Sequence, residues 1–217
     1  MKALIALEDG TIFAGRSFTG PGEAIGEIVF NTSMSGYQEV LTDPSYTGQI
    51  VTMTYPLIGN YGVNPEDMES LGVHPKAFLV KEYHSEPSNF RSTQTLAEFL
   101  GEYDVLGVEG FDTRALVRHI RTAGAMKGLV STEDLDPDSL VERARQWHGL
   151  IGQDMVKLVT CSEPYTWASD RPHSGTSFSP PRRDTEFKLV AFDFGIKFNQ
   201  IRIFEERRCR VQVVPAT

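Results

Sequence analysis

The two cysteines are the side chains best suited to covalent catalysis, but neither stands in a sequence context that would activate it. Cys209 lies between Arg208 and Arg210, whose charges favour a thiolate, whereas the predicted helix that ends just before it opposes one. Cys161 precedes no predicted helix start that would lower its pKa. We therefore predict structural roles for both. The sequence also contains neither G-x-S-x-G nor H-E-x-x-H, the local signatures of serine hydrolases and zinc peptidases.

The residues that could form a phosphate site or a metal site are weaker candidates than the cysteines. The nearest glycine-rich stretch, Gly20 to Gly26, lacks the Walker lysine, has the wrong spacing and carries Glu23 where a phosphate would sit. We interpret it as a plain loop. The histidines show no paired metal-ligand spacing, so surface or core roles are favoured and no metal site is predicted. They are His74, His84, His119, His148 and His173.

One segment, from Asn31 to Gln49, is unusually dense in polar and turn-forming residues. Such a loop can present hydroxyls and amides to a ligand, or it can use them to satisfy its own backbone, and composition alone favours the second role. Within it, Asp43-Pro44-Ser45 predicts a type I turn because proline fixes φ. That turn would leave Ser45 and Tyr46 projecting.

The elements that position this loop are mostly strands. Lys2 to Leu7 and Thr11 to Phe18 flank Asp9-Gly10, a pair that tolerates the positive φ of tight hairpins, so the chain is predicted to open with a hairpin. Further runs with strand character are bounded by Gly, Pro, Asn or Asp. They are Glu27 to Thr32, Gln49 to Tyr55 and Ala77 to Tyr83.

Helical spacing begins after residue 92. Leu96, Phe99, Leu100 and Tyr103 fall on one helix face, and Leu116, Val117 and Ile120 fall on another. Asp112 is placed to cap the second of these helices and Gly124 to end it. A third helix is predicted from Asp136, with Pro137 at its first position, to Gly149. This alternation of strands and helices predicts an α/β or α+β domain.

Residues 168–186 are rich in Pro, Ser, Gly and Arg and nearly free of apolar side chains, so we predict an interdomain linker after a first domain of residues 1–167. Beyond it, Phe187 to Asp193, Ile196 to Arg207 and Arg210 to Val214 predict a parallel βαβ unit over residues 187–217. One such unit cannot bury both faces of its strands. We expect it to be the start of a larger domain that continues beyond Thr217.

Composition narrows the functional classes. The 217 residues are 40% hydrophobic and 23% charged, as in ordinary soluble globular proteins. A formal charge of −8 disfavours nucleic acid as a partner. The apolar stretch from Ala3 to Leu7 is too short for a signal peptide or a membrane span, and two distant cysteines fit a reducing compartment, so we predict a cytoplasmic protein with no membrane partner.

Long, idiosyncratic sequence blocks resemble the glutamine-hydrolysing small subunit of carbamoyl-phosphate synthetase. The block from Asn31 to Gly62, which reads NTSMSGYQEVLTDPSYTGQIVTMTYPLIGNYG, carries most of the likeness. Shorter matches bring nearly the whole chain into the resemblance: Leu7 to Gly15, Glu86 to Thr93, Phe111 to Gly128 and Val190 to Arg202. A block of this length is a poor candidate for chance similarity.

The resemblance implies an α/β protein with a swivelling β/β/α N-terminal domain, followed by the first βαβ of a doubly wound class I glutamine amidotransferase domain. In such enzymes a cysteine attacks the glutamine amide while a histidine, oriented by a glutamate, moves the protons. The matching nucleophile and base would lie beyond Thr217, so we predict no glutaminase activity from this chain alone. Of the family's glutamine-binding residues, Ser45 in the DPSY segment carries over. Asp193 and Lys197 lie at the carboxyl end of the matching strand and in the turn that follows it, and a structural role in the loop or in a subunit contact is favoured for both.

The resemblance also implies partners. Ammonia would pass to a large subunit in a cytoplasmic heterodimer, for carbamoyl phosphate synthesis in arginine and pyrimidine biosynthesis. No cofactor is predicted in this chain, and ATP with a divalent metal is expected on the large subunit. The alternative is a noncatalytic module that only docks to the large subunit. An independent small-molecule hydrolase is a weaker possibility, because no nucleophile and base pair is visible.

Overall fold

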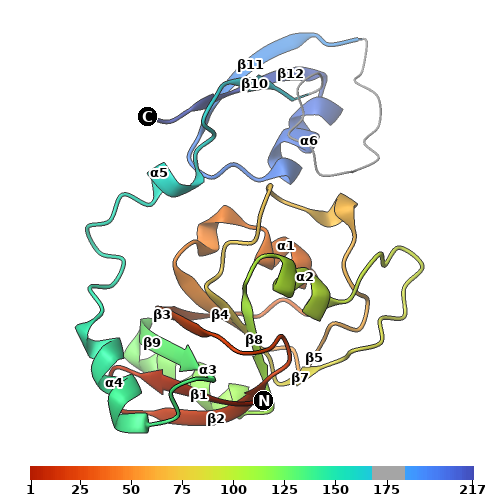
Figure 1. The fold of residues 1–217 in the computed structure, drawn as a ribbon. Coiled ribbons are helices and arrows are strands. Elements are labelled where there is room, and N and C mark those ends of the chain that lie inside the picture. Colours follow the sequence, from red (N-terminus) through yellow and green to blue (C-terminus); the bar gives the residue numbers. More distant parts are fainter. Residues whose placement is uncertain (168–183) are drawn as a thin grey trace.

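The computed structural model describes residues 1–167 and 184–217, and its larger part is a closed β-barrel of mixed strand direction (Figure 1). The strands follow one another around the barrel in the order β1-β2-β8-β6-β4-β3-β9. Their bounds are β1 Lys2–Leu7, β2 Ile12–Ser17, β3 Glu23–Asn31, β4 Gln49–Met53, β6 Ala77–Leu79, β8 Leu106–Glu109 and β9 Met126–Ser131. The run β3-β4-β6-β8 is parallel, and the other neighbours are antiparallel.

The barrel begins with the predicted hairpin. Gly10 adopts φ +98°, and the Leu7 N–H donates to the Thr11 carbonyl at 2.9 Å. Strand β1 is buried on both faces because Ile5 and its alternate neighbours fill the barrel, while Ala6 packs outside it against helix α4, Pro137–Gln146. This double burial explains the unbroken apolar run at the start of the chain.

Two of the helices begin at the predicted caps. Asp112 accepts the Ala115 N–H at 2.9 Å at the start of α3, Thr113–Ala123, and Asp136 accepts the Asp138 N–H at 3.1 Å at the start of α4. Helix α2, Leu96–Glu102, starts with a capping box between Thr95 and Glu98. The short elements are α1 Tyr37–Leu41, the 3-10 turns Pro44–Tyr46 and Pro65–Asp67, and the strand pair β5 Leu57–Ile58 and β7 Glu82–Tyr83.

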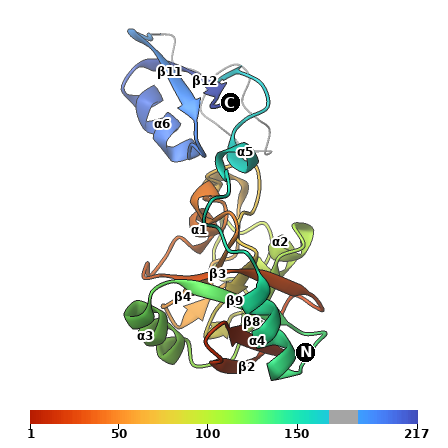
Figure 2. The ribbon, with the colours of Figure 1, turned by 90° about the vertical axis from the view of Figure 1, so that its left-hand side faces the viewer.

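A second, smaller sheet lies beyond the end of the barrel that carries α1 and α2 (Figure 2). Its order is β10-β12-β11, with bounds β10 Tyr165–Thr166, β11 Phe187–Asp193 and β12 Cys209–Pro215. Strands β11 and β12 pair in parallel and are joined by α6, Phe198–Glu206, so the predicted βαβ unit is confirmed. Helix α5, Val156–Val159, lies on the segment that leads from the barrel to this sheet.

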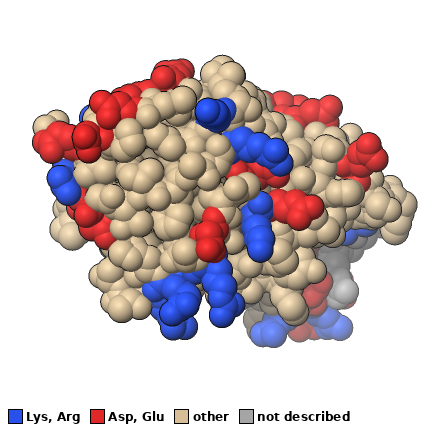
Figure 3. All heavy atoms as spheres, turned by 90° about the horizontal axis from the view of Figure 1, so that it is seen from below, with Lys and Arg blue, Asp and Glu red and all other residues tan. Residues whose placement is uncertain are grey.

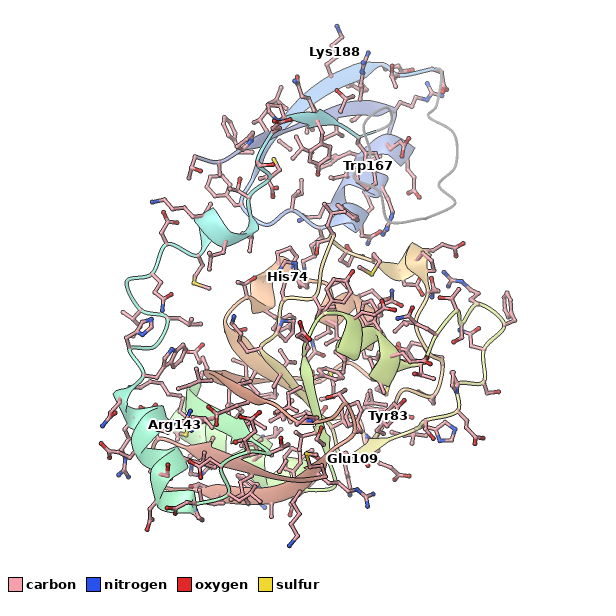
Figure 4. The ribbon with its side chains drawn as sticks, in the orientation of Figure 1. His74, Tyr83, Glu109, Arg143, Trp167 and Lys188 are labelled. Carbon is pink, nitrogen blue, oxygen red and sulfur yellow. The ribbon has the colours of Figure 1, made fainter. Side chains whose placement is uncertain are left out.

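Trp167 packs in the core of the second sheet, where its ring lies 5.1 Å from that of Phe198 (Figure 4). Strand β10 also belongs to this sheet, although it falls inside the predicted first domain of residues 1–167. The predicted linker, 168–186, lies outside the described residues except for its last three positions. The three domain assignments therefore stay predictions.

Two local predictions are wrong in part. The stretch Gly20 to Gly26 is not all loop, because β3 already begins at Glu23. Gly26 belongs to that strand, and a Cβ at this position would lie 2.7 Å from the Gly48 carbonyl oxygen of the neighbouring strand entry. The predicted strand from Ala77 to Tyr83 is divided between β6 and β7, which belong to different sheets.

None of the helices in the described part of the chain is both long and apolar enough to cross a lipid bilayer.

Candidate functional site

The Pro44–Tyr46 turn that carries Ser45 is rigid and faces outward. It is one turn of 3-10 helix with Pro44 at its first position, and the Tyr46 N–H closes the predicted turn by donating to the Asp43 carbonyl at 3.1 Å. The Asp43 side chain caps it by accepting the Ser45 N–H at 2.9 Å, and the Thr47 N–H donates to the Pro44 carbonyl at 3.1 Å. Pro44 is buried whereas Ser45 is exposed, so the backbone is fixed while the residue stays accessible.

This turn lies directly against the loop that follows β11. Gly195 in that loop has φ +94°, and a Cβ there would come within 3.1 Å of the Pro44 Cβ and 3.2 Å of a Val159 methyl group. Only glycine combines this conformation with so close an approach. Beside it, Lys197 Nζ lies 2.6 Å from Asp43 Oδ2, so the residue that caps the turn also binds the second sheet.

Asp193 organises the same loop from inside. Its carboxylate is buried and accepts three backbone N–H groups, from Gly195 at 3.0 Å, Ile196 at 2.8 Å and Cys161 at 2.7 Å. These three hydrogen bonds are those of a residue that fixes a loop. The contacts of Asp193 and of Lys197 agree with the structural roles favoured from the sequence.

Glu69 provides a second link between the barrel and α6. Its carbonyl accepts the Phe198 N–H at 2.8 Å, and its Oε2 accepts the Asn199 N–H at 2.9 Å, while Arg202 Nη1 lies 3.6 Å from Oε1. Burial raises the pKa of the Glu69 carboxyl, although these donors oppose the shift. Sequence reasoning missed Glu69, because its helix partner lies 130 residues further along the chain.

Two cavities flank the turn. The first, about 650 Å³, is polar; it lies between the barrel loops and the start of α6, and its walls include Tyr46, Asp43 and Lys197. The second, about 420 Å³, lies between the barrel and the α5–β10 segment, and its walls include Pro44 and Asp193. Ser45 thus sits between two residues that each line one cavity. Ser45 itself lines neither cavity.

His74 supports the turn from below, on the side of the barrel that faces the second sheet (Figure 4). Its Nε2 lies 2.7 Å from Ser70 Oγ and its Nδ1 lies 3.1 Å from Thr47 Oγ1. Each hydroxyl also lies near a backbone carbonyl oxygen, Ser70 Oγ 2.7 Å from that of Thr42 and Thr47 Oγ1 2.8 Å from that of Pro44. Because a neutral imidazole has one N–H, one of the two hydroxyls donates its single proton to the ring. Burial lowers the pKa of His74, so the ring is neutral near pH 7. Because the Ser70 hydroxyl is buried and engaged in this way, the Ser–His pair braces the loop.

The cysteines occupy structural positions. Burial, aided by the nearby Asp193 carboxylate, raises the pKa of Cys161 to about 11, so its thiol is protonated at neutral pH. Cys209 opens β12 and packs, partly buried, against the core of the second sheet. Across residues 1–167 and 184–217, no three His, Cys, Asp or Glu side chains gather as a metal site would require.

Comparison with known proteins assigns the chain to a family. A family model described as "Carbamoyl-phosphate synthase small chain, CPSase domain" matches residues 5–130, which make up most of the barrel. The chain belongs to the carbamoyl-phosphate synthase small-chain family. The resemblance predicted from the sequence is therefore confirmed at the level of the family.

Curated relatives match beyond the barrel as well. The carbamoyl phosphate synthase small chain of Syntrophotalea carbinolica is 54% identical over 217 residues, covering 100% of this chain and 58% of that protein. The small chain of Nitratidesulfovibrio vulgaris, strain Hildenborough, is 52% identical over 99% of this chain and 58% of that protein. The small chain of Maridesulfovibrio salexigens is 59% identical over 79% of this chain. The chain thus spans well under two thirds of the length of the first two relatives.

Proposed function

We propose that this chain is the N-terminal part of a glutamine-hydrolysing small subunit of carbamoyl-phosphate synthase. The subunit would release ammonia from glutamine and supply it to a large subunit, which would use ATP and a divalent metal to make carbamoyl phosphate for arginine and pyrimidine biosynthesis. Membership of the small-chain family and matches along the whole chain support this proposal. On this proposal, the barrel is the swivelling N-terminal domain and β11-α6-β12 opens a doubly wound amidotransferase domain.

The observation that carries the proposal is the fixed, exposed position of Ser45 at the junction of the two sheets. Its turn is locked by the Asp43 cap and held against Gly195 and Lys197. A serine hydroxyl offers one donor and two acceptor sites, which suits the ammonium and carboxylate groups of an amino acid. Ser45 would bind and orient glutamine, with its backbone already fixed before the ligand arrives.

The groups that cleave the amide are proposed to lie in the part of the small chain that this chain does not match. Neither cysteine here is placed to attack: the pKa of Cys161 is raised to about 11, and its backbone N–H is bound to Asp193. Cys209 lies at the start of a strand, and among the described residues no histidine is hydrogen-bonded to its Sγ. We therefore expect no glutamine hydrolysis from the 217-residue chain.

The experiment is to measure a complete small subunit carrying Ser45→Ala, assembled with its large subunit. Loss of one hydrogen bond to a charged group of glutamine is expected to raise KM for glutamine about tenfold to 100-fold. Synthesis from added ammonia should be unchanged, because ammonia bypasses glutamine binding. Ser85→Ala, at an exposed serine that lines neither cavity, is the control and should leave both activities intact. An unchanged KM for glutamine in the Ser45 variant would overturn the proposed role.

A further inference from the structure

Helix α3 carries a stripe of three exposed arginines, Arg114, Arg118 and Arg121, on a chain whose formal charge is −8. Their spacing of four and then three residues places them on one helix face, over about 10 Å. Figure 2 shows α3 on the flank of the barrel, away from the second sheet, and Figure 3 shows basic side chains gathered at the lower edge of the face it views. The stripe is therefore separate from the junction that carries Ser45.

These three arginines have no partner among the described residues, unlike other arginines of the barrel. Arg16 pairs with Glu109 at 3.1 Å, and Arg91 pairs with Asp67 at 2.7 Å. In residues 1–167 and 184–217, no carboxylate lies within ion-pair distance of Arg114, Arg118 or Arg121. Repulsion between like charges three and four residues apart destabilises a helix, so the pattern is unfavourable for folding alone.

The orientation of α3 is fixed by its packing, so the arginine stripe faces solvent. Leu116 and Ile120, on the opposite face, are buried in the barrel core. Asp112 caps the first turn, and the Gly124 N–H closes the last turn on the Ile120 carbonyl at 2.9 Å. The guanidinium groups are thus presented by a rigid, anchored element, which lowers the entropic cost of binding.

We propose that the arginine stripe of α3 is a docking surface for an acidic surface of a partner protein. Guanidinium groups bind carboxylates in a planar, bidentate geometry, and a row of three fits carboxylates spaced along a helix or strand. A nucleic acid partner is disfavoured by the charge of −8. The inference rests on the proposed function for the identity of the partner, the large subunit of the synthase.

The test compares binding of three forms of the complete small subunit to the purified large subunit. The first is the wild type, the second carries R114Q, R118Q and R121Q, and the third is a control that loses the same charge through K2Q, K81Q and K188Q. All three control lysines are exposed, and none lies on α3. The arginine variant is expected to bind about tenfold to 100-fold more weakly, and the control within about threefold of the wild type.

Salt and folding controls complete the design. Binding of the wild type should weaken as ionic strength rises, and binding of the arginine variant should depend on salt much less. Matching circular dichroism and melting curves establish that all three forms are folded. Equal binding and equal salt dependence of the wild type and the arginine variant would overturn the docking surface while leaving the proposed function standing. No binding by the folded wild type would instead overturn the proposed function, and with it this partner. Self-association lost only in the arginine variant would assign the stripe to a second copy of this chain and overturn the proposal.

Discussion

Replacing Glu69 by alanine should loosen the start of α6 while leaving the barrel folded. The Asn199 N–H lies in the first turn of the helix, where backbone donors have no partner inside the helix, and it is bound only by Glu69 Oε2 at 2.9 Å. A hydrogen bond to a charged group contributes about 1.5–3 kcal/mol net. Arg202 loses little, because it keeps its bonds to the carbonyls of Met68 at 2.8 Å and Glu66 at 3.1 Å.

The expected result follows from these figures. Each 1.4 kcal/mol is a factor of ten, so the Asn199 amide should exchange with solvent about 10- to 150-fold faster in the Glu69→Ala variant. The lower end is favoured, because the raised pKa of Glu69 shows that burying its charge is itself costly, and the variant removes that cost. Residue-resolved hydrogen exchange, followed by NMR, measures the exchange rate of the Asn199 amide directly.

The matched control is Glu66→Ala, which removes an exposed carboxylate paired with Arg91 at 2.9 Å. Exposed pairs contribute about 0–1 kcal/mol, so this variant should change exchange at Asn199 less than about fivefold. The Ile120 amide in the barrel should be unaffected in both variants. Unchanged exchange at Asn199 in the Glu69 variant would refute the reasoning, because it would show that another group protects that amide.

Two further predictions concern the fit of the turn against the second sheet. Gly195→Ala should destabilise the protein by about 1 kcal/mol more than Gly152→Ala, measured by urea unfolding: both glycines have positive φ, but a Cβ meets close contacts only at Gly195. Equal losses would show that the packing there is loose. His74→Gln should flatten the pH dependence of stability. The folded-state pKa of His74 is lowered from 6.5 by burial, so stability present above pH 6.5 is lost as the pH falls below it. The wild type should therefore lose more stability than the variant between pH 7 and 5, and parallel unfolding curves would contradict this.

Local signals predicted the elements whose causes are local. The turn at Asp9-Gly10, the caps at Asp112 and Asp136 and the strand Phe187–Asp193 are all found where the sequence placed them. Each depends on side chains within a few residues of one another, so a short window of sequence contains the necessary information.

Closure of the barrel could not be predicted in the same way. Strand β8 is only four residues long and contains Gly107, and it pairs with β2 and β6, both of which lie far from it in sequence. Gly26 suggested a loop, whereas the structure uses its missing side chain for the close approach of the Gly48 carbonyl. Such contacts depend on the order of the strands in the barrel, which cannot be derived from composition.

In the candidate site, too, the local features were predicted and the long-range contacts were not. Ser45 was identified through resemblance, and the turn that holds it was predicted from Asp43 and Pro44. Its neighbours Gly195 and Lys197 come from a segment about 150 residues away, so their role at the junction needed the structure. Glu69 gave no signal at all, because an isolated glutamate before Ser70 resembles any surface residue until its helix partner is known.

The pairing of β10 with β12 changes how length variation in this chain should be understood. Residues 165–166 and 187–193 lie in one sheet, so the described residues on either side of the gap at 168–183 are held by the same sheet. Closing a loop between fixed ends becomes only about 0.6 kcal/mol more costly for each doubling of its length. We therefore expect an insertion between these two strands to leave the contacts of the second sheet with the barrel in place. A change of length in the α5 segment, by contrast, would alter the path by which the chain crosses from one to the other.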